Sequence, residues 1–308
     1  MNIKDVKIED IKENLKKNGY IGDEDIHYAL YTSLILGKPL LIDGPPGVGK
    51  TEIAKVLSKM FGLELIRLQC YEGMDISKVL YDINYPKQLL YQNIMKENLT
   101  ENLKNLTFEE AIKEIDNKAN FYGEEFLIKR PVLQSFLSKK TSVLLIDELD
   151  KADLEVEAYL LEALSDYSIS IPEYGTVSAK NKPIVVITSN NQREISEALK
   201  RRCIYLYIDY PSIEKETEIL NLQGNIDLDF SRSIAKLINK IRTELSLKQS
   251  PSIAESIEWA ELLFKYLNVT ELTETFKEQI LASVNVLAKN NTDLNKIKNF
   301  IEDSLNEK

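Results

Sequence analysis

The chain has 308 residues, 44% of them hydrophobic, and a formal net charge of −10 at pH 7. This length and apolar fraction suit two globular domains, and the acidic charge with its scattered Lys and Arg argues against nucleic acid as the main partner. Residues 1–17 are charged throughout, so we expect no secretory signal, and no apolar run reaches the length of a membrane span. Neither cysteine stands in a C-x-x-C pair, so we expect no cysteine metal site. Together these features predict a cytoplasmic location.

The first predicted elements are helices within residues 1–17 and over residues 22–36, followed by a short apolar strand over residues 39–43. From Ile53 onward apolar residues recur at helical spacing. Between this strand and this helix stands a motif of the form G-x-x-x-x-G-K-[ST], made of Gly44, Pro45, Pro46, Gly47, Val48, Gly49, Lys50 and Thr51. The strand–loop–helix context is that of a phosphate-binding P-loop.

The chemistry of this motif suits a nucleoside triphosphate with Mg²⁺. Glycines let backbone N–H groups turn toward phosphate oxygens, and the following helix directs its positive end at them. Lys50 supplies a charge for the β- and γ-phosphates and the Thr51 hydroxyl a ligand for Mg²⁺. We count Glu52, which follows the motif, among the nucleotide-binding residues. A plain glycine-rich turn before a helix is the alternative interpretation.

A second strand is expected after residue 64, and residues 70–141 then form a connection much longer than a simple helical crossover needs. Within it, residues 81–95 hold apolar stretches, residues 108–118 have helical spacing, and residues 123–131 read as a strand or a loop. This connection is therefore expected to be an insert with structure of its own.

A continuous apolar run over residues 142–146 predicts a buried strand that ends in two adjacent carboxylates, Asp147 and Glu148. Ligands of open parallel sheets bind beyond the carboxyl ends of the strands, so both should lie beside the P-loop. Asp147 can then hold Mg²⁺, directly or through water, and Glu148 is the candidate base for an attacking water. The alternative is an ordinary strand followed by a charged helix cap.

The next segments complete the expected sheet. Residues 151–164 predict a helix, and residues 168–177 alternate around a turn at Tyr174, as in a hairpin. Residues 183–189 form another apolar strand, after which the Asn190 amide could position the water near Glu148. Arg201 and Arg202 precede the last predicted strand, over residues 204–208, and everything after Pro211 reads as helical.

These segments together resemble the AAA+ ATPases, and more narrowly the MoxR family, in the branch associated with maturation of carbon monoxide dehydrogenase and with von Willebrand factor A-domain partners. The similarity runs from about residue 19 to about residue 267. Beyond the P-loop, or Walker A motif, and the Walker B carboxylates, it is carried by residues 19–21, 65–75, 84–90, 208–211 and 251–255.

The resemblance implies an α/β fold, namely a P-loop AAA+ three-layer sandwich with a central parallel sheet, followed by a smaller all-helical lid domain. The implied boundaries are residues 1–210 for the nucleotide-binding domain and 211–308 for the lid. The first domain would carry a helix-2 insert around residues 75–135 and a hairpin around residues 167–182.

The resemblance also implies residue roles. Asn190 matches sensor 1, and Arg202 matches the arginine finger that acts on the neighbouring subunit, with Arg201 as the fallback. A basic pair that merely caps a helix is the alternative for both arginines. Tyr20 and Ile21 would pack on the adenine, or else belong to the core.

Of two further positions, one matches the family pattern and the other departs from it. Tyr71 stands where related rings carry an aromatic pore loop, although a packed turn tyrosine is the alternative. At the start of a lid helix, where family members often carry the sensor 2 arginine, Pro251 is followed by Ser252.

The function implied is Mg²⁺-dependent hydrolysis of ATP by a hexameric, chaperone-like ring that remodels or matures a protein client together with a von Willebrand factor A-domain protein. Two alternatives remain open at this stage. One is an AAA+ nucleic-acid motor or loader, which the acidic charge disfavours. The other is a nucleotide-gated binding module with little turnover.

Overall fold

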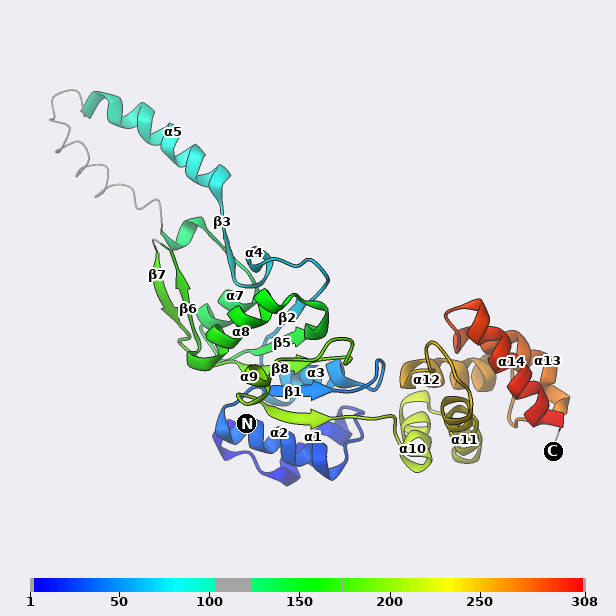
Figure 1. Ribbon diagram of the computed structural model, residues 1–308. Helices are drawn as coiled ribbons and strands as arrows, with labels where there is room; N and C mark the ends of the chain where they lie inside the picture. The colour runs from blue at the N-terminus through cyan, green and yellow to red at the C-terminus, as the bar shows by residue number, and fades with distance from the viewer. Residues whose placement is uncertain (1–2, 103–122, 173, 307–308) are drawn as a thin grey trace.

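The computed structural model describes residues 3–102, 123–172 and 174–306 (Figure 1). The helix expected over residues 108–118 lies outside these ranges. At the amino terminus a short 3-10 turn precedes two helices: η1 (Ile3–Asp5), α1 (Ile8–Lys17) and α2 (Glu24–Leu36). Within the described residues, no helix is both long and apolar enough to cross a membrane.

The centre of the molecule is a five-stranded sheet with the order β2-β5-β8-β1-β9, in which every neighbouring pair is parallel. Its strands are β1 (Leu40–Asp43), β2 (Leu65–Gln69), β5 (Val143–Asp147), β8 (Ile184–Thr188) and β9 (Ile204–Tyr207). The three inner strands are buried at every residue, as expected of a parallel sheet covered on both faces. The predicted α/β fold class is confirmed.

Helices cover both faces of this sheet. One apolar core joins α1, α2 and α3 (Lys50–Phe61) to one face, and a second joins α7 (Pro131–Leu137) and α8 (Leu154–Asp166) to the other. The side chains of a strand alternate between these cores, with Leu40 and Ile42 in the first and Leu41 in the second. This packing fixes the plane and the edges of the sheet.

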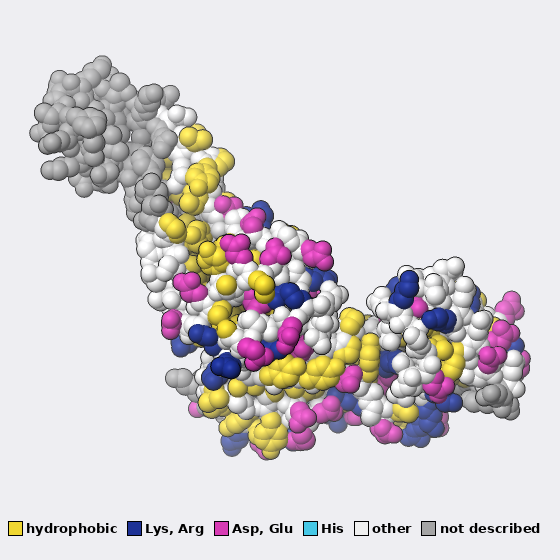
Figure 2. Space-filling view, in the orientation of Figure 1, with side chains coloured by type: hydrophobic (Ala, Val, Ile, Leu, Met, Phe, Trp, Pro, Cys, Tyr) yellow, Lys and Arg dark blue, Asp and Glu magenta, His cyan; other side chains and the backbone are white. Residues whose placement is uncertain are grey.

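The connection from β2 to β5 forms a projecting arm. Its described elements are α4 (Ile76–Val79), β3 (Tyr81–Ile83), α5 (Tyr85–Asn102), η2 (Glu124–Phe126) and β4 (Leu127–Lys129), and β3 pairs with β4 in antiparallel fashion. Helix α5 points away from the sheet (Figure 1). Apolar side chains gather on the arm (Figure 2), and Tyr85, Leu89, Leu90 and Tyr91 of α5 are exposed.

The remaining elements between β5 and β9 are short. They are η3 (Leu149–Lys151), the antiparallel pair β6 (Ser168–Ile171) and β7 (Gly175–Ser178), and α9 (Glu197–Lys200). The pair β6–β7 stands where the sequence predicts a hairpin.

After β9 the described chain is helical and forms a separate cluster beside the sheet (Figure 1). Its elements are α10 (Ile213–Gly224), α11 (Leu228–Glu244), α12 (Ile253–Glu261), the π-helical turn η4 (Leu262–Tyr266), η5 (Glu274–Phe276), α13 (Lys277–Ser283), η6 (Val284–Val286) and α14 (Asn291–Asn306). These helices share a third apolar core around Trp259, which is fully buried. A domain boundary at residues 210 and 211 stays a prediction.

A buried ion pair ties the first helices of this cluster together. Glu216 of α10 accepts two hydrogen bonds from Arg242 of α11, at 2.7 and 2.9 Å, and the two side chains are 0% and 4% exposed. The same guanidinium donates to the Pro251 carbonyl oxygen at 2.8 Å and to Ser256 Oγ of α12 at 3.1 Å. It also lies 4.5 Å from the ring centre of Tyr210, in the segment that leads from the sheet.

This ion pair generates a stability prediction. Removing one partner of a buried pair leaves a charge without compensation, so Glu216→Gln should lower the free energy of unfolding of the helical region by about 3–5 kcal/mol. Urea unfolding followed by fluorescence of Trp259, the single tryptophan, measures this. The control is Lys265→Met, which breaks the half-exposed pair with Glu261 and should cost less than about 1 kcal/mol. Equal, small losses in both variants would contradict the prediction.

Candidate functional site

The P-loop lies between β1 and α3, and two of its glycines, Gly44 and Gly47, have no space for a side chain. Gly44 and Gly47 have φ angles of 146° and 76°. A Cβ atom at Gly44 would come within 1.9 Å of the Ile208 carbonyl oxygen, and one at Gly47 within 2.2 Å of Ser252 Cβ. Gly49, with φ 89°, is the N-cap of α3. The loop is therefore packed between β9 and the helical region, and its shape depends on glycine.

Lys50 begins α3 and turns back into the loop. Its side chain is largely buried, and Nζ donates hydrogen bonds to the carbonyl oxygens of Gly44 and Pro45, each at 2.6 Å. Burial of the ammonium group lowers the pKa of Lys50 from its usual 10.5 to about 8, although nearby carboxylates, led by Asp43, oppose the shift. A phosphate group beside Nζ would replace these neutral acceptors with charged ones.

Asp43 holds the start of the P-loop through hydrogen bonds, a role that was not predicted from the sequence. Its Oδ1 accepts the Gly44 N–H at 2.9 Å and Ser189 Oγ at 3.0 Å, and Oδ2 lies 3.3 Å from the Tyr205 hydroxyl. These contacts join β1, β8 and β9 where the P-loop starts. The signal was present, because Asp43 is a polar residue at the end of an otherwise apolar strand.

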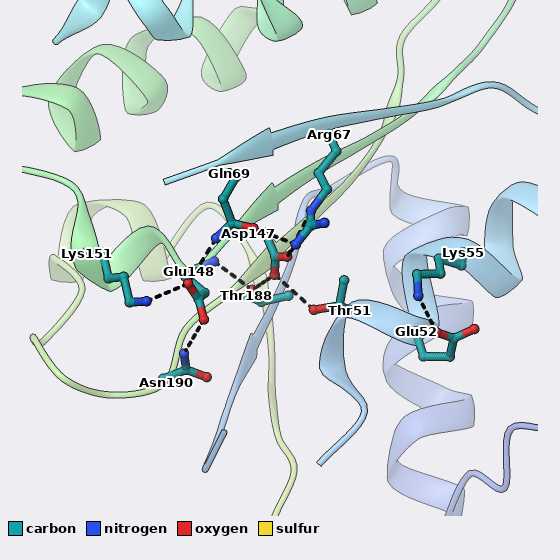
Figure 3. A network of polar contacts seen from close by, with 10 residues as sticks. All are labelled: Thr51, Glu52, Lys55, Arg67, Gln69, Asp147, Glu148, Lys151, Thr188 and Asn190. Carbon is teal, nitrogen blue, oxygen red and sulfur yellow. Dashed lines mark hydrogen bonds and ion pairs between the residues drawn. The ribbon is translucent and has the colours of Figure 1, made fainter. Parts of the chain in front are cut away.

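Asp147 lies at the end of β5, 3% exposed, and both of its oxygens are engaged (Figure 3). Oδ1 accepts hydrogen bonds from Thr51 Oγ1 at 3.0 Å and Thr188 Oγ1 at 2.6 Å. Oδ2 accepts two from the Arg67 guanidinium, at 3.1 Å from Nε and 2.5 Å from Nη2. A carboxylate and a hydroxyl in contact are the oxygen donors that Mg²⁺ prefers, so this pair fits the ion.

Glu148 follows with the left-handed φ of 57°, which is unusual for a residue with a side chain. This conformation turns its carboxylate away from that of Asp147 and toward other donors. Oε1 accepts from Asn190 Nδ2 at 3.0 Å, and Oε2 accepts from Gln69 Nε2 at 2.9 Å and Lys151 Nζ at 2.8 Å (Figure 3). The structure thus brings Glu148 and Asn190 together, and it adds Gln69 and Lys151.

A cavity of about 420 Å³ extends from the P-loop to the helical region. This volume is in the range of small-molecule sites. Six of the expected nucleotide contacts line it: Tyr20, Ile21, Gly47, Val48, Gly49 and Glu52. Helices α10 and α12 line it from the other side, through Lys215, Ile219, Gln223, Ile253 and Ile257. Tyr20 is buried, and this burial raises the pKa of its hydroxyl. The amino-terminal loop and α10 also meet directly, because Gln223 Nε2 donates to the Gly19 carbonyl oxygen at 2.7 Å.

The helical region touches the P-loop at the position of the missing arginine. Ser252 is the N-cap of α12 and forms a capping box with Glu255. It lies against Gly47, and the Ile253 N–H donates to the Gly47 carbonyl oxygen at 3.2 Å. Contact between the two parts therefore runs through backbone and a small side chain at this point.

Three other predicted residues lie on the surface. Arg201 and Arg202 follow α9 and are both exposed, and Arg202 Nη1 donates to the Ala198 carbonyl oxygen at 3.1 Å. No hydrogen bond or ion pair within the described chain joins either arginine to Asp147 or Glu148. Tyr71 follows β2 and is 48% exposed.

Comparison with known proteins gives the family of this arrangement. Residues 39–203, more than half of the chain, match the sequence profile described as AAA domain (dynein-related subfamily). An uncharacterized protein of Staphylococcus haemolyticus is 23% identical over 295 residues, which cover 93% of this chain and 98% of the relative. Another, of Staphylococcus saprophyticus, is 24% identical over 243 residues, which cover 76% and 80%. A solved structure from Cytophaga hutchinsonii, presented as a candidate ATPase, is 18% identical with a TM-score of 0.46 and covers 94% of this chain and 85% of its own.

The lowered pKa of Lys50 predicts that binding of a nucleoside triphosphate weakens in alkaline solution. Below pH 8 the free protein holds the lysine charged, whereas above pH 8 binding must first restore the proton. The dissociation constant, measured by calorimetry, should therefore rise about tenfold from pH 7 to pH 9. Any binding by Lys50→Arg should not vary with pH, because arginine stays charged throughout. A constant affinity in the unaltered chain would contradict the prediction.

Proposed function

The chain belongs to the AAA domain family, in its dynein-related subfamily, and from this premise we propose that it is a Mg²⁺-dependent ATPase of the MoxR type. In this proposal it forms a hexameric ring that remodels or matures a protein client with the help of a von Willebrand factor A-domain protein. The ring and the partners rest on the resemblance of the motifs, and the hydrolysis rests on the site.

One observation carries the proposed hydrolysis. Two neighbouring contacts lie at one end of the sheet: Thr51 with Asp147 at 3.0 Å, and Asn190 with Glu148 at 3.0 Å. The first can hold the metal and the second can hold a water, and the Lys50 ammonium lies in the loop beside them. A metal ion, a base and a fixed positive charge are the parts that phosphoryl transfer requires.

Each side chain then has a role. Lys50 neutralises the β- and γ-phosphates, while Thr51 and Asp147 hold Mg²⁺, which supplies positive charge to the same phosphates. Glu148 takes the proton of the attacking water, and Asn190 orients that water between Glu148 and the γ-phosphate. Tyr20 and Ile21 border the cavity where the adenine would lie.

The arginine finger makes the proposed site incomplete in a single chain. Arg202 is exposed and does not contact the carboxylates of its own chain in any described hydrogen bond or ion pair, as a group that serves a neighbouring subunit requires. A finger supplied by a neighbour is worth about 10³–10⁵ in rate. Assembly would therefore control hydrolysis.

The experiment that tests the function is the steady-state ATPase rate per subunit, with Mg²⁺, measured over about three decades of protein concentration. A rate that climbs and then saturates is expected, because each site needs a neighbour. Glu148→Gln should still bind ATP but lose at least about 10² of the saturated rate. Tight ATP binding with negligible hydrolysis at every concentration would favour the binding module, and stimulation by DNA would favour the nucleic-acid motor.

Mixing of variants tests the finger. Arg202→Ala alone should be inactive because it lacks the arginine finger. Lys50→Ala alone should be inactive because it lacks the lysine that contacts the phosphates. Mixed rings should regain part of the activity, because some sites combine an intact Lys50 with a neighbour's intact Arg202. The matched control is Arg201→Ala, which should keep its activity. Co-purification with differently tagged chains checks that mixed rings form, and inactive mixed rings would refute the assignment of Arg202.

A further inference from the structure

Two polar side chains of the edge strand β2 reach the site from outside. In β2 the residues Ile66 and Leu68 are buried, while Arg67 and Gln69 face away from the core. The pairing of β2 with β5 sets Gln69 opposite Asp147. Arg67 and Gln69 are two residues apart and so project from the same face of the strand. Together they lie along the two Walker B carboxylates.

These side chains form a continuous chain of contacts between the carboxylates (Figure 3). The Arg67 guanidinium donates twice to Asp147 Oδ2 and once, from Nη2, to Gln69 Oε1 at 2.5 Å. The amide nitrogen of Gln69 in turn donates to Glu148 Oε2 at 2.9 Å. The position of Gln69, and with it one of the donors to Glu148, is thus coupled to the position of Arg67.

We infer that Arg67 is a resident counter-cation of the metal site, which holds Asp147 through its guanidinium and withdraws from this carboxylate when Mg²⁺ binds. The inference rests on the proposed function, because it assumes that Thr51 and Asp147 are the metal contacts. It assigns Arg67 a positioning role that acts through Asp147 and Gln69.

Charge and burial support this inference. Asp147 is 3% exposed, and Glu148 and Asp150 follow it closely in the chain, so a positive charge beside this buried carboxylate offsets the cost of burying it. Arg67 supplies that charge. A divalent cation at the same carboxylate would repel the guanidinium, and both would compete for the lone pairs of Asp147.

Because Arg67 is exposed, its movement away from Asp147 costs little free energy. Its side chain is 53% exposed on an edge strand, whereas that of its partner Asp147 is 4% exposed. The guanidinium can therefore rotate toward the solvent without opening the core, and water solvates it in that position. Asp147 cannot move in the same way, because Thr51 and Thr188 hold its other oxygen.

The test measures how much Mg²⁺ the site needs. Binding of fluorescently labelled ADP to the full chain is followed while Mg²⁺ is titrated, in the unaltered chain and in Arg67→Met. Removal of the competing cation should lower the Mg²⁺ midpoint about tenfold. Arg232→Met is the matched control, since it removes the same charge from an exposed position on α11 and should leave the midpoint unchanged.

Two more variants keep the test decisive if Arg67→Met folds poorly. Arg67→Lys keeps the charge but loses the two-pronged contact, and Gln69→Leu removes one support of Arg67, so both should lower the midpoint by less than Arg67→Met is expected to. A midpoint that is unchanged or higher in all these variants would overturn the inference, because Arg67 would then be neutral or helpful to the metal. If the unaltered chain binds no nucleotide at any Mg²⁺ concentration, the proposed function itself fails, and the inference with it.

Discussion

The arrangement of the site depends on one buried carboxylate. Asp147 is almost completely removed from water, and a buried charge is tolerated only where partners satisfy it. Those partners come from separate elements: Thr51 from the first turn of α3, Thr188 from the end of β8 and Arg67 from β2. Satisfying Asp147 therefore sets the P-loop helix and the strands on both sides of β5 at fixed distances. The parallel sheet makes this possible, because it gathers the carboxyl ends of its strands at one edge.

Much of this edge could be predicted from the sequence. Lys50 belongs to the P-loop motif, whereas Asp147, Glu148 and Asn190 stand at or just past the ends of apolar runs, and the rule that ligands bind beyond parallel strands brings these residues together. Arg67, Gln69 and Thr188 were missed for a physical reason. A polar residue on an edge strand reads as a solvated face, and Thr188 reads as the last residue of an apolar strand, so neither signals a contact. Only the strand order, which sets β2 beside β5, shows that Arg67 and Gln69 point at the carboxylates.

The contact between the P-loop and the helical region could not be predicted either, because it depends on how two separately folded parts meet. The sequence showed only that an arginine was missing beside Pro251. The structure shows Ser252 against Gly47 and a backbone hydrogen bond from Ile253 to the same glycine. Behind this contact, Arg242 joins Glu216, the Pro251 carbonyl and the ring of Tyr210. A shift of the P-loop would thus press on the start of α12, which Arg242 holds in place. Steric contact can therefore couple the two parts, although the sensor 2 arginine is absent.

Under the proposed function Glu148 is the catalytic base, and its hydrogen-bond partners affect this role. Glu148 can accept a proton only if an oxygen is free for water, yet three donors surround its carboxylate: Asn190, Gln69 and Lys151. These three donors occupy most of the acceptor positions of the carboxylate, so they compete with a water molecule for its oxygens. Movement of one donor would therefore make a carboxylate oxygen more accessible to the attacking water. Gln69 is the one coupled to the metal site, because its amide oxygen is held by Arg67. Asn190 is needed beside the water, and Lys151 is bound to the chain segment that carries Glu148 itself. Gln69 is therefore the donor whose movement would disturb the rest of this network least.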